Sequence, residues 1–517
     1  MFKKSLSAML ILIMIFSLAL PAFASESEGA FEEYPTIYVT GAQTNQLYNA
    51  EGKLIYPFTK PLMEVAKDII APTIKDLILG NITGNFDAFN NNVLSLLNDV
   101  FGDVQLDING EASDGSHPEF HSSTVAVSDK KGNYGMWDFR FWYDWRLSPV
   151  DCALELKNYI DRVKEATGKD KVQLVGRCYG ANLIQAYITL YKDHAIDSVS
   201  DVAYYSQSIT GIDFMSAFFS GKFSIEDKAA ENFLKFFIED KDLIKDPVAV
   251  EIAVTTIELM NEFRSLSVLT WAIDNFLNNL VRDTLIPDAV LATVGSWPSY
   301  WSMVNPDLYE ASRDFVFAGR KDEYAGFIAK TDKFHYDVQL KTEETILELQ
   351  EKGINFYIFT KYNFPDFPLY EGATNQSDGY TCVKKQSFGA VSADFGEVLS
   401  EEYINGLSDK TYLSPDYKID ASTCLIPERS WFIKNLYHSY FEVLHPMTLE
   451  IMRYDLTVES DKYPQYIYHE NDNLTAMEGT DEDYNKATES IFVKFARLFK
   501  LIGEYIKNSM SKKANAA

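Results

Sequence analysis

The segment Gly176-Arg-Cys178-Tyr-Gly180 has the form Gly-x-nucleophile-x-Gly. Residues 171–175 before it are typical of a buried strand, and residues 181–191 after it are typical of an apolar helix. A strand that turns sharply into a helix needs both glycines because the turn has no room for side chains there. The turn exposes its central residue above the sheet, and the helix amino terminus faces the thiol or an oxyanion. We therefore predict that Cys178 is a catalytic nucleophile.

A second signal follows the strand predicted over residues 36–40, where the chain continues with Gly41. An acyl-transfer site of this kind takes one oxyanion N–H from the residue after the nucleophile and another from the loop after such a strand. This predicts oxyanion-hole amides at Tyr179 and Ala42, with Gln43 as the alternative to Ala42. On its own, this glycine would indicate only an ordinary turn at a strand end.

The predicted general base is His438, because it follows a short apolar strand at residues 431–433. In this type of site the chain order is nucleophile, acid, histidine, and the base lies in a loop at a strand end. His445 remains the alternative. The other histidines are His117, His121 and His194, which lie outside this window, His335, where a helix is expected to begin, and His469.

The predicted acid is Asp378, in the turn Gln376-Ser-Asp-Gly after the strand expected at residues 355–359. An Asp-Gly turn exposes the carboxylate of its aspartate. Asp394 and Asp420 remain alternatives for this role.

The elements around these residues alternate between helix and strand. A helix is predicted over residues 148–167, with Gly168 as its stop, and another strand over residues 199–205. This order indicates a mostly parallel central sheet with helices on both faces. The predicted divisions are a signal peptide at 1–24, a first core part at 25–213 with a helical insertion at 61–101, a helical cap at 214–290, a second core part at 291–480, and an amphipathic C-terminal helix at 481–517.

Several of these motifs together resemble a known family. Tyr143-Asp-Trp-Arg, the turn at Cys178, the Asp378 turn, the late His438 and the tract Gly295-Ser-Trp-Pro-Ser are similar to the lecithin:cholesterol acyltransferase-type group of α/β-hydrolases. Bacterial lipases share the later arrangement of acid and histidine. The resemblance covers roughly residues 34–215 and 290–445. It implies an α/β-hydrolase fold and hydrolysis or transfer of acyl groups from lipid-like substrates under a helical cap.

The sequence departs from that family at two places. The nucleophile is a cysteine instead of a serine, and the loop Gly41-Ala-Gln-Thr-Asn has less glycine than is common there. A thiolate attacks readily, but it also leaves a tetrahedral intermediate more readily than an alkoxide does. Cys178 therefore favours activated acyl groups such as thioesters and aryl esters over plain esters, unless His438 protonates the departing alcohol.

Composition limits the partners. The formal net charge of the 517 residues is −28, which repels nucleic-acid phosphates and anionic lipids at long range. We therefore expect no nucleic-acid partner, and the sequence indicates neither a cofactor nor zinc-type Cys/His spacing. Among the four cysteines, Cys152 is expected to fill space on a helix, and Cys382 and Cys424 are candidates for one disulfide bridge. The sequence leaves the oligomeric state open.

The two ends of the chain indicate where the protein is located in or outside the cell. Two lysines precede an apolar run at residues 9–20, and Ala22-Phe-Ala is a cleavage signal, so we expect a secreted protein that begins at Ser25. Residues 486–507 form an amphipathic pattern. This helix is expected to dock on the catalytic domain, with contact to a membrane or cell surface as the alternative.

The favoured function is an acyl hydrolase or acyltransferase with a Cys178–His438–Asp378 triad and a covalent acyl-enzyme. One alternative is a binding or surface protein that kept the fold and lost efficient chemistry. The other is a peptidase or amide hydrolase on the same scaffold, since fold alone does not select the reaction.

The leader sequence gives a first testable expectation. When the full chain is expressed in a bacterial host, the exported protein should begin at Ser25, as read by amino-terminal sequencing. Replacing residues Ile11–Met14 with charged residues should hold the full-length chain inside the cell, because the apolar run would be lost. Export of that variant at the normal level would contradict the assignment.

Overall fold

The computed structural model describes residues 34–58, 73, 75–239, 246–477, 493–502 and 504–505. The predicted leader therefore lies outside the described residues. Within them, the largest sheet has eight strands in the order β13-β12-β11-β8-β7-β6-β1-β5, and all neighbours are parallel except β12 and β13 at one edge. The strands are β1 Thr36–Val39, β5 Phe139–Phe141, β6 Val172–Arg177, β7 Val199–Tyr205, β8 Asn355–Tyr362, β11 Ser430–Lys434, β12 Tyr466–Glu470 and β13 Asn473–Ala476.

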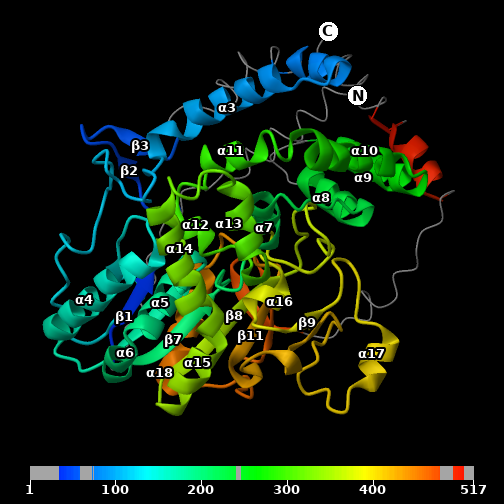
Figure 1. Ribbon diagram of the computed structural model, residues 1–517. Helices are drawn as coiled ribbons and strands as arrows, with labels where there is room; N and C mark the ends of the chain where they lie inside the picture. Colours follow the sequence, from blue (N-terminus) through cyan, green and yellow to red (C-terminus); the bar gives the residue numbers. More distant parts are fainter. Residues whose placement is uncertain are drawn as a thin grey trace, which may run out of the picture.

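Alternate residues of the strands enter two hydrophobic clusters, one on each face of the sheet. On β1, Ile37 and Val39 join the cluster that contains residues of α4 and α5, whereas Tyr38 joins the cluster that contains residues of α18. These helices are α4 Pro149–Thr167, α5 Tyr179–Leu190 and α18 His445–Tyr454. Both faces are covered, which confirms the predicted α/β class with a mostly parallel sheet (Figure 1).

The helix before the nucleophile strand begins and ends as its sequence predicts. The side chain of Ser148 accepts a hydrogen bond from the N–H of Val150 at 3.2 Å, and Gly168 closes the helix with a φ of 73°. α4 therefore occupies the residues that its apolar spacing indicated.

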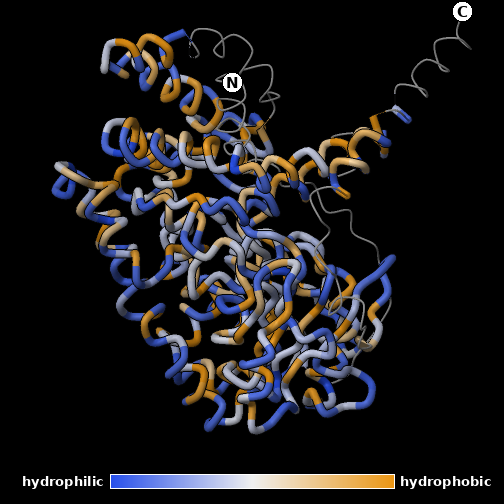
Figure 2. The backbone as a smooth tube through the Cα atoms, turned by 90° about the vertical axis from the view of Figure 1, so that its right-hand side faces the viewer, coloured by the Kyte–Doolittle hydropathy of each residue, from blue (hydrophilic) through white to orange (hydrophobic). Residues whose placement is uncertain are grey.

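The segment predicted as a cap is built mainly from helices, and residues 240–245 of it lie outside the described residues. In Figure 1, α8 to α11 form a layer above the sheet, and hydrophobic and hydrophilic residues alternate along the helices of that layer in Figure 2. The boundaries at residues 214 and 290 stay a prediction. The helices are α7 Asp213–Ser220, α8 Asp227–Glu239, α9 Pro247–Glu262, α10 Ser265–Asn275, a π-helix Phe276–Val281 and α11 Ile286–Leu291.

The predicted insertion over residues 61–101 is helical where the structure describes it. Residues 75–83 are helical and α3 spans Asp87–Phe101, whereas residues 59–72 lie outside the described residues. Asn90 donates a hydrogen bond to the hydroxyl of Thr284 at 3.1 Å, so α3 lies against the end of the cap segment.

The C-terminal helix is described over residues 493–502. Lys494 forms an ion pair with Glu262 at 2.8 Å, and the ring of Phe495 lies 5.5 Å from that of Phe263. The described part of this helix therefore contacts the cap at α9.

The remaining elements connect these layers. Small sheets are formed by β2 Leu47–Tyr48, β3 Leu54–Tyr56 and β4 His117–Pro118, and by β9 Val391–Ser392 and β10 Ile419–Asp420. The other α-helices are α6 Lys192–Ser198, α12 Pro298–Trp301, α13 Tyr309–Val316, α14 Ala325–Asp337, α15 Thr342–Glu351, α16 Val383–Gln386 and α17 Glu401–Gly406. No helix within the described ranges is both long and apolar enough to cross a bilayer.

The Tyr-Asp-Trp-Arg motif forms a buried ion pair below the site. Arg146, whose side chain is fully buried, reaches both carboxylate oxygens of Asp144 at 3.0 and 2.6 Å, and it donates to the hydroxyl of Ser116 at 3.0 Å. Trp145 donates from its indole to the carbonyl of Asn45 at 2.9 Å. The motif therefore ties the loop after β1, at Asn45, to the segment that contains Ser116.

Breaking this pair should destabilise the fold. Arg146→Met leaves the Asp144 carboxylate buried and unpaired, which should lower the free energy of unfolding by about 3–5 kcal/mol. The double variant Asp144→Leu with Arg146→Met should lose less than the sum of the two single losses, because no charge is then left unpaired. Urea unfolding measures both effects.

The matched control is Lys157→Met, which removes one of two partners of the exposed Asp161 carboxylate. It should cost at most about 0.5 kcal/mol. A loss of similar size in Arg146→Met would show that the buried pair does not support the fold.

Candidate active site

The turn at Cys178 is strained, and its two glycines cannot be replaced without a clash. Cys178 has a φ of 49° and a ψ of −123°, a conformation that costs a non-glycine residue of order 1–3 kcal/mol. A Cβ at Gly180 would lie 2.2 Å from the carbonyl oxygen of Val39, and a Cβ at Gly176 would lie 2.9 Å from the Cα of Ala181. A sharp strand-to-helix turn with a strained central residue between two close-packed glycines is the geometry that a nucleophile elbow requires.

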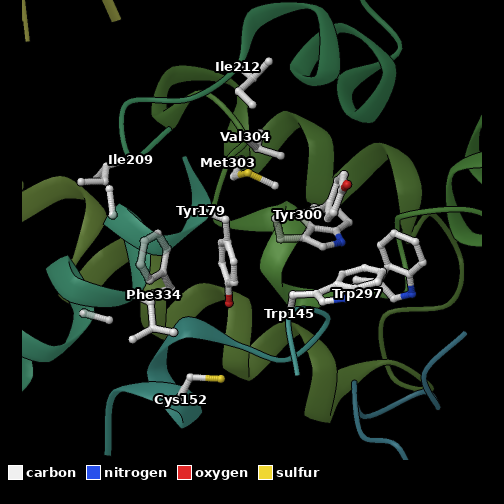
Figure 3. Close-up of a cluster of buried hydrophobic side chains, with 14 of the residues drawn as sticks. Trp145, Cys152, Tyr179, Ile209, Ile212, Trp297, Tyr300, Met303, Val304 and Phe334 are labelled. Atoms are coloured by element: carbon white, nitrogen blue, oxygen red, sulfur yellow. The ribbon is translucent and has the colours of Figure 1, made fainter. Parts of the chain in front are cut away.

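Aromatic packing holds the residue that follows the nucleophile. The Tyr179 hydroxyl donates to the carbonyl of Leu147 at 2.7 Å. The ring of Trp297 lies 5.1 Å from that of Trp145 and 5.2 Å from that of Tyr300, and Figure 3 shows these rings with Tyr179 in one buried cluster. This packing fixes the backbone at the first turn of α5.

The loop after β1 lies directly against Cys178. A Cβ at Gly41 would meet the Cβ of Cys178 at 3.3 Å and its sulfur at 4.0 Å. Thr44 donates to the carbonyl of Gly41 at 2.8 Å, and the hydroxyl of Tyr143 donates to the carbonyl of Thr40. The half-buried Ala42, the predicted oxyanion donor, directly follows Gly41, which lies against Cys178.

The predicted acid and base form a direct hydrogen bond. Nδ1 of His438 lies 2.7 Å from Oδ2 of Asp378, and both side chains are buried. Oδ1 of Asp378 accepts hydrogen bonds from the N–H groups of Tyr380 and Thr381 at 3.0 and 2.9 Å. With one ring nitrogen held by the carboxylate, the imidazole lies close enough to Cys178 for each group to shift the pKa of the other. These bonds orient the imidazole.

Cys178 and His438 are coupled in charge. Burial raises the pKa of the Cys178 thiol, but the charge and hydrogen bond of His438, the charge of Arg177 and the amide of Tyr179 lower it by more, so this pKa lies below its ordinary value. Burial lowers the pKa of His438, whereas the Asp378 carboxylate and the Cys178 thiolate raise it, and the balance brings it to about 9. At a pH above the pKa of Cys178 and below that of His438, the pair is therefore a thiolate and an imidazolium.

The alternative base, His445, is a core residue. It begins α18, with its ring 5.4 Å from that of Tyr38 and 4.9 Å from that of Trp137. Burial, together with nearby cations, lowers the pKa of His445 to about 3. The structure brings His438, and not His445, to Cys178. His335 also differs from expectation, since it lies in the last turn of α14 instead of at a helix start.

The alternative acids take other hydrogen bonds. Asp394 accepts from the hydroxyl of Thr374 at 2.9 Å, and Asp420 accepts from the hydroxyl of Tyr403 at 2.9 Å. Of the three candidate acids, Asp378 is therefore the one that is hydrogen-bonded to His438.

The candidate disulfide is absent, since Cys382 and Cys424 are both free and buried. The sulfur of Cys382 instead lies 3.6 Å from a carboxylate oxygen of Asp213. Cys152 is buried on α4, as expected. Within the described part of the chain, no group of three or more His, Cys, Asp or Glu residues is placed to hold a metal ion.

The sequence analysis did not identify Lys361, a charged residue beside Cys178 and Asp378. It is fully buried on β8, and its charge acts on Asp378 and Cys178. A lysine near the end of an otherwise apolar strand was the available signal, but such residues usually reach solvent.

The coupling between Cys178 and His438 can be tested without a substrate. Iodoacetamide should alkylate Cys178 in the wild type at a lower pH than it alkylates free cysteine, because the thiolate is the reactive form and the pKa of this thiol is lowered. In His438→Ala, burial should dominate the thiol pKa, so the rate near pH 7 should fall about tenfold or more.

The matched control is His194→Ala, a partly exposed histidine paired with Asp161 on another helix. Its alkylation rate should stay within about twofold of the wild type, since it does not touch Cys178. Mass spectrometry identifies the modified cysteine, and equal rates in wild type and His438→Ala would contradict the coupling.

The assignment of the fold is supported by the sheet order and by the turn at Cys178, and comparisons with known proteins add no support. No protein-family model and no curated protein matches the chain. A solved structure titled "The crystal structure of Tle4-Tli4 complex" is similar at 15% identity and a TM-score of 0.18, over 36% of this chain and 48% of the other. The similar part thus spans about half of that chain.

Proposed function

We propose that this protein is a secreted acyl hydrolase or acyltransferase that acts on thioester, ester or lipid-like acyl substrates through a covalent acyl-enzyme. The observation that carries the proposal is the chain of contacts from Cys178 through His438 to Asp378 at the strained turn above β6. A nucleophile, a base hydrogen-bonded to it and a carboxylate that orients the base are the parts that nucleophilic acyl transfer requires.

Acylation begins with attack of the Cys178 thiolate on the acyl carbonyl carbon. A carbon–sulfur bond forms and the carbonyl oxygen becomes an oxyanion. The amide of Tyr179 is near enough to the sulfur to lower the pKa of the thiol, and we assign this amide and that of Ala42 to stabilise the oxyanion. His438 then gives its proton to the departing thiol or alcohol as the bond to the leaving group breaks.

Deacylation uses the same groups in reverse. Neutral His438 takes a proton from water or from an acceptor alcohol, and the oxygen attacks the thioester carbon. Collapse of this second intermediate expels the Cys178 thiolate and releases an acid or a new ester. Asp378 stays ionised throughout, because the charges of His438 and Lys361 hold its pKa below the ordinary value despite burial.

The thiol and its surroundings favour activated acyl groups. The first intermediate can expel either the thiolate or the leaving group of the substrate, so a good leaving group drives the reaction forward. Aromatic rings lie beside the base: the ring of Tyr380 is 4.9 Å from that of His438, and Phe214 of the cap segment is 6.2 Å from Tyr380. Such apolar walls suit the lipid-like acyl groups that the family resemblance implies.

The location of the protein in this proposal rests on the leader sequence at residues 1–24. The compartment and the peripheral surface contact are part of the proposal and are supported by sequence alone.

The nucleophile gives the direct test of the proposal. Cys178→Ala should abolish turnover in a panel of p-nitrophenyl esters and acyl thioesters. In Cys178→Ser, acylation should slow with activated substrates, because serine depends wholly on His438 to lose its proton. The loss on plain alkyl esters should be smaller, because the intermediate then contains no thiolate to expel. The ratio of kcat/KM for thioesters to that for alkyl esters should therefore fall.

Two outcomes would count against the proposal. Full activity in Cys178→Ala removes this residue from the mechanism. Selective alkylation of Cys178 without turnover of any acyl substrate would instead favour a binding protein that kept the fold.

A further inference from the structure

Lys361 is a buried cation in the central sheet. It lies on β8, one residue before the strand ends at Tyr362, and its relative exposure is 0%. A buried ammonium group costs several kcal/mol unless other groups replace its hydration. The groups that contact the Lys361 ammonium therefore indicate the role of this residue.

All three N–H groups of the ammonium have acceptors, and every acceptor lies in the loop that carries the proposed base. Nζ of Lys361 lies 2.8 Å from the carbonyl oxygen of His438, 2.9 Å from that of Tyr440 and 3.3 Å from that of Tyr437. A neutral amine has only two N–H groups, and a shorter or apolar side chain could not satisfy this set. Lys361 thus fixes the backbone at His438, while Asp378 fixes the imidazole ring.

The charge of Lys361 also fits the site. Asp378, Cys178 and Glu442 favour its protonated form, whereas Arg177 opposes it, and the buried His445 lies close enough for Lys361 to lower its pKa. Burial outweighs the favourable charges and lowers the pKa of Lys361 to about 7. In the reactive state two negative charges, the thiolate and the carboxylate, face one imidazolium, so below a pH of about 7, where Lys361 is protonated, its charge adds to that of Arg177 in stabilising them.

We propose that Lys361 is a positioning residue for the proposed reaction, which fixes the His438 loop through three carbonyls and balances the buried charge of the thiolate site. This inference rests on the proposed function. It assigns no step of bond making or breaking to Lys361. Its two contributions, hydrogen bonding and charge, can be separated by substitution.

Two substitutions separate them. Lys361→Gln keeps N–H donors for the loop but no charge, and Lys361→Met removes both. The matched control is Lys434→Met on the neighbouring strand β11, because Lys434 is also a buried lysine but pairs with Asp416 at 3.0 Å. Thermal unfolding of each full-length variant reports whether the fold is kept, and Lys361→Gln serves alone if Lys361→Met does not fold.

The first readout needs no substrate. The pH midpoint for iodoacetamide alkylation of Cys178 should rise in both Lys361 variants, and the rate below that midpoint should fall about threefold or more, since each lacks the cation. Lys434→Met should keep the wild-type midpoint. A change in packing alone would not shift the midpoint equally in Gln and Met.

The second readout is turnover of an activated ester. Loss of the carbonyl contacts should lower kcat by about tenfold or more in Lys361→Met and by less in Lys361→Gln, with KM nearly unchanged, because the misplaced group acts on the reaction and not on binding.

The outcomes separate the two proposals. A folded Lys361→Gln with the wild-type midpoint and the wild-type kcat overturns the role of Lys361, while the triad stands. A wild-type Cys178 that shows neither low-pH alkylation nor turnover overturns the proposed function itself.

Discussion

The active-site geometry depends on one close approach between backbones. α5 lies so near the end of β1 that a Cβ at Gly180 would come within 2.2 Å of the Val39 carbonyl oxygen and 2.6 Å of that of Thr40. This contact fixes the first turn of α5 against the loop that begins at Gly41. Cys178, the amide of Tyr179 and the loop that begins at Gly41 are therefore positioned together, and the strain at Cys178 is held by the packing around it.

A second constraint is electrostatic. The imidazolium and the carboxylate are buried and the thiolate is partly buried, so each charge gains stability from an opposite neighbour. The groups alternate in sign from Cys178 to His438 to Asp378 to Lys361. Within this order the pKa of the imidazole rises while those of the thiol and the carboxyl fall, and each shift supports the next. The fold supplies the order within one mostly parallel sheet, because Cys178 directly follows β6, Lys361 lies near the end of β8 and His438 lies in the loop after β11.

The sequence predicted those features that short-range patterns determine. The turn at Cys178 and the strand β7 follow from local spacing, and His438 and Asp378 follow from chain order after predicted strands. The partners of Lys361 lie in a loop that follows a different strand, so no local pattern could indicate them. The free thiols of Cys382 and Cys424 depend on tertiary distance, and the burial of His445 depends on which side of the sheet α18 covers. Such features arise from packing between distant segments.

The cap segment contributes to the same site through aromatic contacts. Phe236 of α8 stacks on Tyr437 at 6.3 Å, and Phe233 lies 5.0 Å from Phe367, in the loop that leads to Asp378. These rings adjoin Tyr380, whose ring lies beside that of His438. Apolar rings next to the base limit the access of water, which strengthens each charge interaction within the site.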